Sequence, residues 1–185
     1  MRGQPETSTL KITIYDPLQD SLEEITALLH QAYAPLAAMG FNYVAATQDA
    51  DVTLKRLTAG ISYVAWLDDA IAGVITYYPE TKTEFDEPEH YMNPEVAYFG
   101  QFAVSPTLQK LGIGNKLLEL VEEKALHAGK TTLACDTAEG ALHLIHFYQT
   151  RGYAPVGYHQ WPHACYRSII LSKPLATGFT YTTQA

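Results

Sequence analysis

The chain has 185 residues, of which 47% are hydrophobic and 17% charged, and its formal net charge is −8. This length suits one globular domain, which buries enough surface to need no disulfide or metal for stability. The negative charge argues against a nucleic-acid partner, no apolar run approaches the ~18 residues of a membrane span, and the polar residues 1–10 are unlike a secretory signal.

The chain contains two cysteines, Cys135 and Cys165. Two are too few for the disulfide framework of a small secreted protein, so both thiols are expected to be reduced. We therefore expect a cytoplasmic protein.

The N-terminal part of the chain predicts one strand followed by two helices. Residues 10–15 alternate apolar and polar side chains, which is typical of a strand. Residues 21–24, Ser-Leu-Glu-Glu, have the pattern of a capping box, and the apolar residues that follow recur at helical spacing. An irregular stretch is predicted at residues 35–48 because it begins at a proline, and a short helix at residues 49–59.

The middle of the chain predicts three strands and a long loop. The apolar runs 61–67 and 71–78 are separated by Asp-Asp-Ala, which indicates a hairpin. Residues 79–94 are acidic and predict a loop. Residues 95–104 predict the next strand, which ends at Ser105 and a proline.

The C-terminal part alternates between the two types of element. A strongly amphipathic helix is predicted at residues 112–128, with a glycine after its last turn. A strand at residues 131–135 and a helix at residues 141–151 follow. Two strands, at residues 153–161 and 166–171, complete the series.

The predicted order of elements is β-α-α-β-β-β-α-β-α-β-β. Because hairpins and helical crossovers both occur, this order predicts an α/β fold with a mixed sheet. We expect a single domain over residues 1–175 and a polar tail at residues 176–185.

The segment between the strand ending at residue 104 and the amphipathic helix has the properties of an anion-binding loop. A helix N-terminus presents unpaired amides and the positive end of its dipole, which together suit a pyrophosphate. Two glycines one residue apart let the backbone approach a ligand closely, and a lysine adds positive charge. The loop residues are Gln109, Lys110, Leu111, Gly112, Ile113, Gly114 and Asn115.

Three other interpretations of this loop are a Walker loop, a dinucleotide-binding turn and a plain structural turn. A Walker loop needs Ser or Thr after Gly-Lys, but Gly114 is followed by Asn115. A dinucleotide-binding turn needs a third glycine where Leu117 stands, although Asp136 lies where a ribose-binding acid would be expected. An NAD(P)-dependent oxidoreductase therefore stays an alternative, as does a plain structural turn.

Three segments together resemble the GNAT-type N-acetyltransferases. The first is residues 102–106, Phe-Ala-Val-Ser-Pro. The second contains Gln109, Gly112 and Gly114, which match the family's coenzyme-A loop Gln/Arg-x-x-Gly-x-Gly/Ala. The third is residues 147–153, in which Tyr, three residues, Gly and an aromatic residue match the family's late helix. The element order also agrees, so the resemblance covers residues 9–175.

The resemblance implies a single-domain fold with a mostly antiparallel central sheet flanked by helices. It also implies acetyl-CoA as co-substrate, no metal, and direct transfer of the acetyl group through a tetrahedral intermediate. The acceptor would be a primary amine of a small molecule or a peptide. The residues expected at the coenzyme are Phe102, Ala103 and Val104 of the strand, together with the loop from Gln109 to Asn115. A coenzyme-A-binding regulator without turnover is the main alternative.

The resemblance also gives Tyr148 as the general acid that protonates the departing sulfur, because a phenol can donate a proton at hydrogen-bond distance. Glu95 is the first candidate for the base and Asp136 the second. No base is needed if desolvation delivers a neutral amine. Cys135 ends an apolar strand, which favours a buried, inert thiol over a nucleophile.

The acceptor is expected near the first two helices and the last hairpin, where aromatic residues are frequent. Aromatic side chains suit an apolar amine or a cation. The substrate-binding candidates are Tyr33, Phe41, Tyr158 and Trp161. Ala141 stands where many family members have a coenzyme-binding Asn. The histidines His143 and His146 are interpreted as a polar helix face and not as metal ligands, and a homodimer stays an open alternative.

Overall fold

The computed structural model describes residues 8–80 and 87–175. Residues 1–7, 81–86 and 176–185 lie outside this description. The predicted polar tail and part of the predicted acidic loop fall among them.

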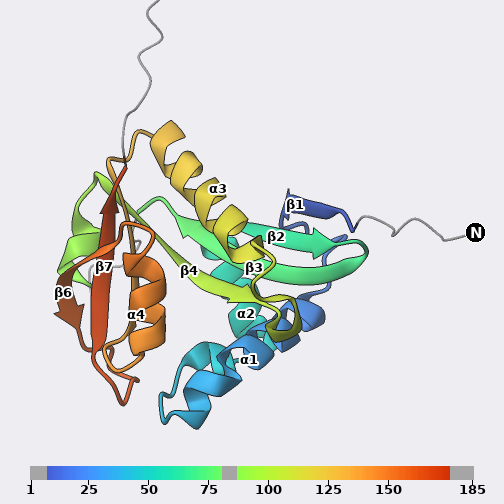
Figure 1. The fold of residues 1–185 in the computed structure, drawn as a ribbon, viewed down its shortest axis with the longest axis horizontal. Helices are drawn as coiled ribbons and strands as arrows, with labels where there is room; N and C mark the ends of the chain where they lie inside the picture. Colours follow the sequence, from blue (N-terminus) through green and yellow to red (C-terminus); the bar gives the residue numbers. More distant parts are fainter. Residues whose placement is uncertain (1–7, 81–86, 176–185) are drawn as a thin grey trace, which may run out of the picture.

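Seven strands of the described chain form one sheet in the order β1-β2-β3-β4-β5-β7-β6 (Figure 1). All neighbouring strands are antiparallel except β4 and β5, which are parallel. The predicted mixed, mostly antiparallel sheet is thus confirmed. The strands are β1 (Leu10–Ile14), β2 (Ile61–Leu67), β3 (Ala70–Tyr78), β4 (Val96–Val104), β5 (Thr132–Ala138), β6 (Ala154–His159) and β7 (Ser168–Pro174).

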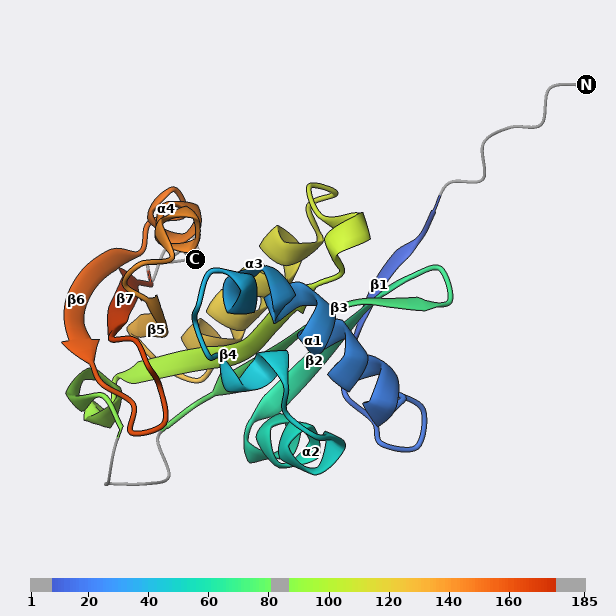
Figure 2. The ribbon, with the colours of Figure 1, turned by 90° about the horizontal axis from the view of Figure 1, so that it is seen from below.

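Helices cover both faces of this sheet, and Figure 2 shows α2 and α4 on opposite sides of it. Period-two alternation of the strands divides the core accordingly. On β3, Ile75 packs with the residues of α3, whereas its neighbour Val74 packs with those of α1 and α2. No helix of the described segments is long and apolar enough to cross a membrane. The helices are α1 (Leu22–Ala38), α2 (Ala50–Ala59), α3 (Ile113–His127) and α4 (Leu142–Gln149).

Helix α1 begins as the sequence predicts but ends later. The Ser21 hydroxyl accepts a hydrogen bond from the Glu24 amide at 3.2 Å, which caps the N-terminus. The prediction that Pro35 ends the helix is wrong. Pro35 lies in the last turns of α1, its carbonyl accepts from the Met39 amide at 3.2 Å, and the next residue, Leu36, is buried. Packing of Leu36 keeps the chain helical where propensity alone would end the helix.

Strands β5 and β7 are longer than predicted. The sequence suggests that β5 stops at Cys135 because polar residues follow. In the structure β5 continues to Ala138, and seven residue pairs join it to β7, from Thr132 opposite Pro174 to Ala138 opposite Ser168. Pairing with a neighbouring strand therefore extends β5 through polar residues that carry little strand signal.

The end of the predicted acidic loop is ordered structure. Glu89–Met92 forms a short 3-10 helix, and Tyr91 within it is 2% exposed. The ring of Tyr91 stacks on Tyr98 of β4 with centroids 4.3 Å apart. This part of the chain consequently packs on the sheet, where the sequence predicts only a loop.

Candidate active site

The sheet opens between its two parallel strands. β4 and β5 pair over three residues of β4, from Val96 to Tyr98, and then separate, although β4 continues to Val104 and β5 to Ala138. The backbone groups of β4 beyond Tyr98 therefore have no strand partner on the β5 side. We call this region the opening.

A β-bulge shapes the β4 side of the opening. Between the pairs Val74–Ala103 and Thr76–Gly100, β3 has one residue, Ile75, and β4 has two, Gln101 and Phe102. A bulge of this kind bends its strand and re-aims the residues after it. Gln101 adopts a left-handed conformation with φ of 48°, which costs ~1–3 kcal/mol for a residue other than glycine.

Side chains from α2 and the turn before it hold this bulge. Gln101 is 7% exposed, and its Oε1 accepts a hydrogen bond from Gln48 Nε2 at 2.9 Å. Gln48 Oε1 accepts in turn from Arg56 Nη1 at 3.0 Å. This buried chain of hydrogen bonds offsets the strain at Gln101 and fixes the shape of β4 at the opening.

Two tyrosines line the opening from the α1 side. The Tyr33 hydroxyl donates to the Phe102 carbonyl at 3.3 Å, whereas the Tyr43 hydroxyl accepts from the Ala138 amide at 2.7 Å. Their ring centroids are 5.4 Å apart, so the pair reaches from β4 to β5. Burial raises the pKa of both phenols, which keeps them protonated.

Tyr148 of α4 reaches the opening from the other face of the sheet. Its side chain is 7% exposed and packs against Phe99, Phe147 and Tyr153, with ring centroids 5.2 to 6.0 Å away. Burial raises the pKa of Tyr148 well above its usual value. Its hydroxyl makes no hydrogen bond with any described residue, so a protonated donor remains unused.

The loop before α3 presents free amides. Gly112 has φ of 83°, which only glycine adopts without strain, and it begins the helix. No described group accepts a hydrogen bond from the amides of residues 109–115. A Cβ added to Gly114 would lie 3.4 Å from the Phe102 ring and 3.5 Å from Val104, so the start of α3 adjoins the end of β4. The site therefore offers unpaired donors beside the opening, as an anion requires.

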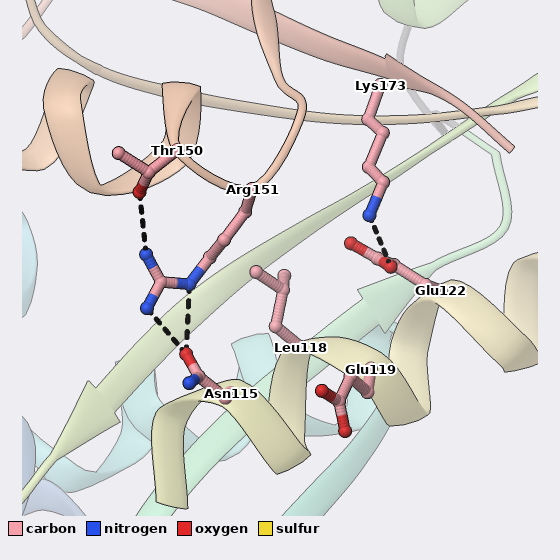
Figure 3. A pocket seen from close by; sticks show the side chains of 7 residues that line it. All are labelled: Asn115, Leu118, Glu119, Glu122, Thr150, Arg151 and Lys173. Atoms are coloured by element: carbon pink, nitrogen blue, oxygen red, sulfur yellow. Dashed lines mark hydrogen bonds and ion pairs between the residues drawn. The ribbon is translucent and has the colours of Figure 1, made fainter. Parts of the chain in front are cut away.

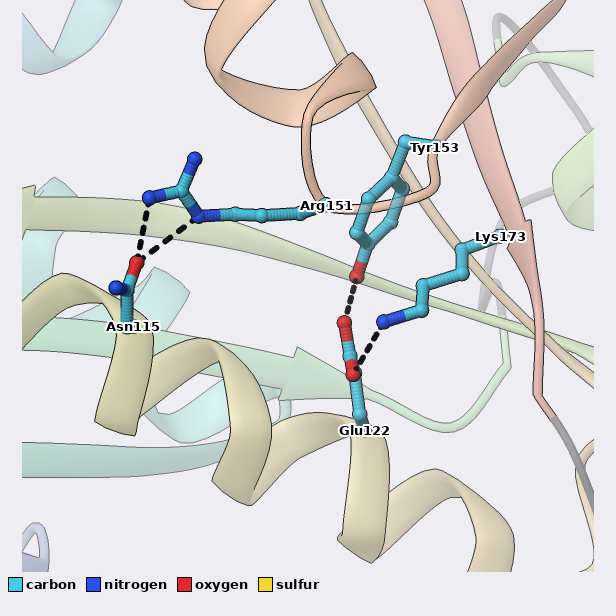
Figure 4. Close-up of polar contacts among 5 residues, drawn as sticks. All are labelled: Asn115, Glu122, Arg151, Tyr153 and Lys173. Carbon is cyan, nitrogen blue, oxygen red and sulfur yellow. Dashed lines mark hydrogen bonds and ion pairs between the residues drawn. The ribbon is translucent and has the colours of Figure 1, made fainter. Parts of the chain in front are cut away.

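A groove of about 370 Å³ runs between α3, the end of α4 and β7 (Figure 3). At one end the Arg151 guanidinium stacks over the Phe147 ring, 3.6 Å from its centroid, and donates a hydrogen bond to Asn115 Oδ1. At the other end Glu122 accepts from the Tyr153 hydroxyl at 3.0 Å and from Lys173 at 2.7 Å (Figure 4). The groove lining is Asn115, Leu118, Glu119, Glu122, Thr150, Arg151 and Lys173.

Asp136 of β5 lies at the opening on the face opposite Tyr148. It is directly opposite Ile170 of β7, which packs with Tyr91, whereas its neighbour Cys135 belongs to the core that contains Tyr148. Trp161 Nε1 donates to Asp136 Oδ2 at 3.0 Å, and the Tyr91 hydroxyl donates to Oδ1 at 3.2 Å. This carboxylate is thus firmly oriented.

The two catalytic candidates from the sequence are not brought together. Glu95 precedes β4, is exposed, and its Oε2 accepts from the Thr131 hydroxyl at 3.1 Å. It lies four residues before Phe99, or ~13 Å along an extended strand. Glu95 therefore lies at the paired end of β4 and β5, whereas Asp136 lies at the opening.

The substrate-binding candidates also divide. Tyr33 and Trp161 lie at the opening. Phe41 packs edge-on against Tyr166 at 5.6 Å, behind Tyr43. Tyr158 is 57% exposed and lies opposite Ile169, on the other face of the sheet from Asp136, with Arg167 over its ring at 4.2 Å.

Residues that sequence reasoning missed include Gln48, Gln101 and Tyr91. A buried Gln or a bulge has no local sequence signal, because its partners are distant in the chain. Tyr91 has a weak signal, since it is an aromatic residue within an otherwise acidic stretch. Among the described residues, no group of three or more His, Cys, Asp or Glu is arranged to hold a metal ion.

The fold is shared by acetyltransferases of known structure. The family model "Acetyltransferase (GNAT) family" matches residues 23–153. The chain belongs to this family and is an N-acetyltransferase. The alternative of an NAD(P)-dependent oxidoreductase is thereby removed, and Leu117, where the third glycine would stand, is fully buried in the core.

Curated relatives from Bacillus subtilis agree with this assignment. An S-(2-succino)cysteine N-acetyltransferase is 33% identical over 138 residues, which is 73% of this chain and 79% of the relative. The uncharacterized N-acetyltransferase YvbK is 31% identical over 103 residues, 56% of this chain and 59% of the relative.

Solved structures agree in fold. A GNAT family acetyltransferase from Elizabethkingia anophelis with acetyl-CoA bound has a TM-score of 0.62 and 20% identity, covering 90% of this chain and 98% of that one. A Bacillus subtilis acetyltransferase in complex with CoA has a TM-score of 0.63 and 21% identity, covering 91% and 100%.

Proposed function

We propose that this protein transfers an acetyl group directly from acetyl-CoA to a primary amine of a small molecule or a peptide. The opening between β4 and β5 carries the proposal, because it leaves the backbone groups of β4 after Tyr98 without a partner strand and connects the two faces of the sheet. Free amides and Tyr148 lie on one face, and Asp136 on the other. Donor and acceptor would therefore meet from opposite sides.

The donor side consists of three groups of residues. The amides from Gln109 to Asn115 would hold the diphosphate, and Lys110 would add charge. Phe102 is the second residue of the bulge and Val104 follows it, and the backbone of these two residues would bind the pantetheine arm. Bound acetyl-CoA supplies the acetyl group and a thiolate leaving group.

Tyr148 would act as the general acid. Its phenol stays protonated because its pKa is raised, and its hydroxyl is not engaged by a described residue. As the bond between carbonyl carbon and sulfur breaks, Tyr148 would give its proton to the sulfur and regain one from solvent.

Asp136 is the better placed of the two candidates for the base. Its carboxylate would accept, directly or through one water, the proton that the acceptor's ammonium group must lose before the neutral amine attacks the thioester carbon. Glu95 would act only across a longer water chain, given its distance along β4. We propose Asp136 for this role and a structural role for Glu95 at the end of the sheet.

Two further points support a small acceptor in a reducing compartment. The curated relative that covers most of this chain is named for a cysteine derivative, which is a small molecule. Both cysteines, Cys135 and Cys165, are free, which suits the cytoplasm.

Thermal-shift measurements with acetyl-CoA, CoA, NAD and NADP, followed by a thiol-release assay with a panel of primary amines, test this proposal. A ligand at 100 times its Kd stabilises the native state by about 2.7 kcal/mol, so coenzyme A should raise the Tm while the nicotinamide cofactors should not. Thiol release that depends on the amine is the expected result. A Tm shift without release would indicate a coenzyme-A-binding regulator instead.

A further inference from the structure

We infer that the acceptor is a cationic amine with no carboxylate beside its amino group, selected by Asp136 and the aromatic side chains around it. The inference rests on the proposed function and adds the chemical class of the acceptor. We call these residues the Asp136 cluster: Asp136, Tyr33, Tyr43, Tyr91, Trp161 and Tyr166.

The first argument is position. Asp136 follows Ala134, the last residue of β5 that pairs with β4, by two residues. It is consequently at the edge of the opening. Because Cys135 faces the core that contains Tyr148, Asp136 faces the side from which the acceptor must come.

The second argument is the surroundings of the carboxylate. Each oxygen accepts one hydrogen bond from a neutral donor, Trp161 Nε1 or the Tyr91 hydroxyl. The Tyr43 hydroxyl hydrogen-bonds to Thr137 and Ala138, the two residues after Asp136, and the rings of Tyr33 and Tyr166 lie 5.4 and 4.8 Å from the Tyr43 ring. Aromatic faces around a carboxylate attract an ammonium group through cation–π and ionic contacts together.

The third argument is that the charge of Asp136 is not neutralised. The ion pairs among the described residues are Arg167 with Glu139 and Lys173 with Glu122, and neither includes Asp136. A part-buried carboxylate that has only neutral donors is stabilised by an incoming cation.

The same face holds a buried hydroxyl without a hydrogen-bond partner among the described residues. Ser168 is fully buried, and its Oγ has no hydrogen-bond partner among the described residues. It lies opposite Ala138, two positions along β5 from Asp136, so both side chains are on one face of the sheet. A bound polar acceptor would offer the partner that this hydroxyl lacks.

An acceptor with a carboxylate would be disfavoured. Arg56 acts on Tyr33 of the cluster, but its Nη1 is already engaged by the side-chain oxygen of Gln48. A second carboxylate would thus face Asp136 across a site with little screening. This distinguishes the chain from its relative, since S-(2-succino)cysteine carries several carboxylates.

Steady-state kinetics with matched acceptors test the inference. The pairs are tyramine and tyrosine, histamine and histidine, and phenethylamine and phenylalanine, with S-(2-succino)cysteine added. For each pair kcat/KM is expected to be at least about tenfold higher for the amine, which corresponds to ~1.4 kcal/mol. Asp136→Asn should lower this preference at least about fivefold and leave the KM for acetyl-CoA unchanged. Loss of a base alone would lower kcat/KM for the amine and for the amino acid of each pair by the same factor.

Glu139→Gln is the matched control, because it removes a carboxylate near the same end of β5 but outside the Asp136 cluster. The ratio of kcat/KM for amine and amino acid in this variant should equal that of the unmodified protein. Equal or better use of the amino acids or of S-(2-succino)cysteine would overturn the inference and leave the proposed function standing. Acetyl-CoA binding without turnover of any amine would overturn the inference too. No Tm shift with coenzyme A would overturn the proposed function itself, and the inference with it.

Discussion

The Arg151 guanidinium donates two hydrogen bonds to the Asn115 side-chain oxygen, from Nε at 2.9 Å and from Nη2 at 2.6 Å. These bonds join Arg151, the second residue after α4, to the first turn of α3 (Figure 4). No described carboxylate is paired with Arg151. A positive charge without a counterion therefore lies beside the free amides of the loop, where the phosphates of the coenzyme are proposed to bind.

Arg151→Gln should raise the KM for acetyl-CoA about tenfold, the effect of one hydrogen bond to a charged group at ~1.4 kcal/mol, and leave kcat within about twofold. Lys173→Gln is the control, since Lys173 lines the same groove but is paired with Glu122. Initial rates at varied acetyl-CoA concentration give KM and kcat for both variants. An equal rise in KM for the two variants would mean that Arg151 has no special role.

Gly112 allows a matched pair of substitutions at the anion loop. A Cβ at Gly112 meets no atom within 4 Å, and Asn and Asp would carry the same backbone strain at its left-handed φ of 83°, so a comparison of the two isolates the charge. Gly112→Asp should weaken coenzyme A binding at least about tenfold more than Gly112→Asn, because its carboxylate repels a diphosphate. Calorimetric titration at low salt measures the difference. Equal affinities of the two variants would place the diphosphate elsewhere.

Tyr148→Phe should lower kcat at least about tenfold and change the KM for acetyl-CoA less than about twofold, since it removes a proton donor but keeps the ring. Because burial raises the pKa of Tyr148, deprotonation of this phenol should not reduce kcat of the unmodified protein below about pH 10. A pH profile of kcat for both forms tests this. Equal kcat values at every pH would exclude Tyr148 from the mechanism.

Much of the architecture is predictable from local sequence. The two wrong element ends, those of α1 and β5, have a common physical reason, because tertiary contacts override the local pattern there. The strand and helix pattern, the start of α1 at Ser21 and the glycine at the start of α3 depend on neighbours in the chain. The sequence predicts an end of α1 at Pro35, but the packing of Leu36 outweighs the helix-breaking tendency of proline. The sequence predicts that β5 ends at Cys135. Its pairing with β7, which lies about 35 residues away in the chain, extends it through Asp136.

The candidate site divides in the same way. The coenzyme loop and Tyr148 are motifs of contiguous residues, so sequence reasoning finds them. Asp136 was placed second to Glu95, because the structure alone shows that Trp161 and Tyr91 orient it and that β4 and β5 separate beside it. Distances across the opening depend on tertiary contacts that no local pattern encodes.

The buried tyrosines should make the protein sensitive to alkali. Burial raises the pKa of Tyr33, Tyr148 and Tyr153 above the ~10 of an unfolded chain. Above pH 10 the unfolded chain loses these protons while the folded chain keeps them, so the unfolded state gains stability. The free energy of unfolding should be constant below about pH 9 and then fall by up to ~1.4 kcal/mol per pH unit for each such tyrosine. Urea unfolding between pH 8 and 11 measures this, and a flat profile would contradict it.

Tyr77 offers a stabilising substitution. It is 1% exposed, and its buried hydroxyl has no hydrogen-bond partner among the described residues. Tyr77→Phe keeps the ring and removes the unsatisfied group, so the free energy of unfolding should rise by about 1 kcal/mol. Tyr153→Phe is the contrasting variant, because the Tyr153 hydroxyl donates to Glu122 and its loss should destabilise. Urea unfolding at pH 7 compares them; a destabilised Tyr77→Phe would indicate a partner for that hydroxyl.

Amide chemical shifts of the isotope-labelled protein during titration with coenzyme A test the central claim most directly. If the opening and the start of α3 form the donor site, the amides of residues 112–115 and of Phe102 and Val104 should shift together, with one saturation curve. Unchanged signals from these amides at millimolar coenzyme A would contradict the account.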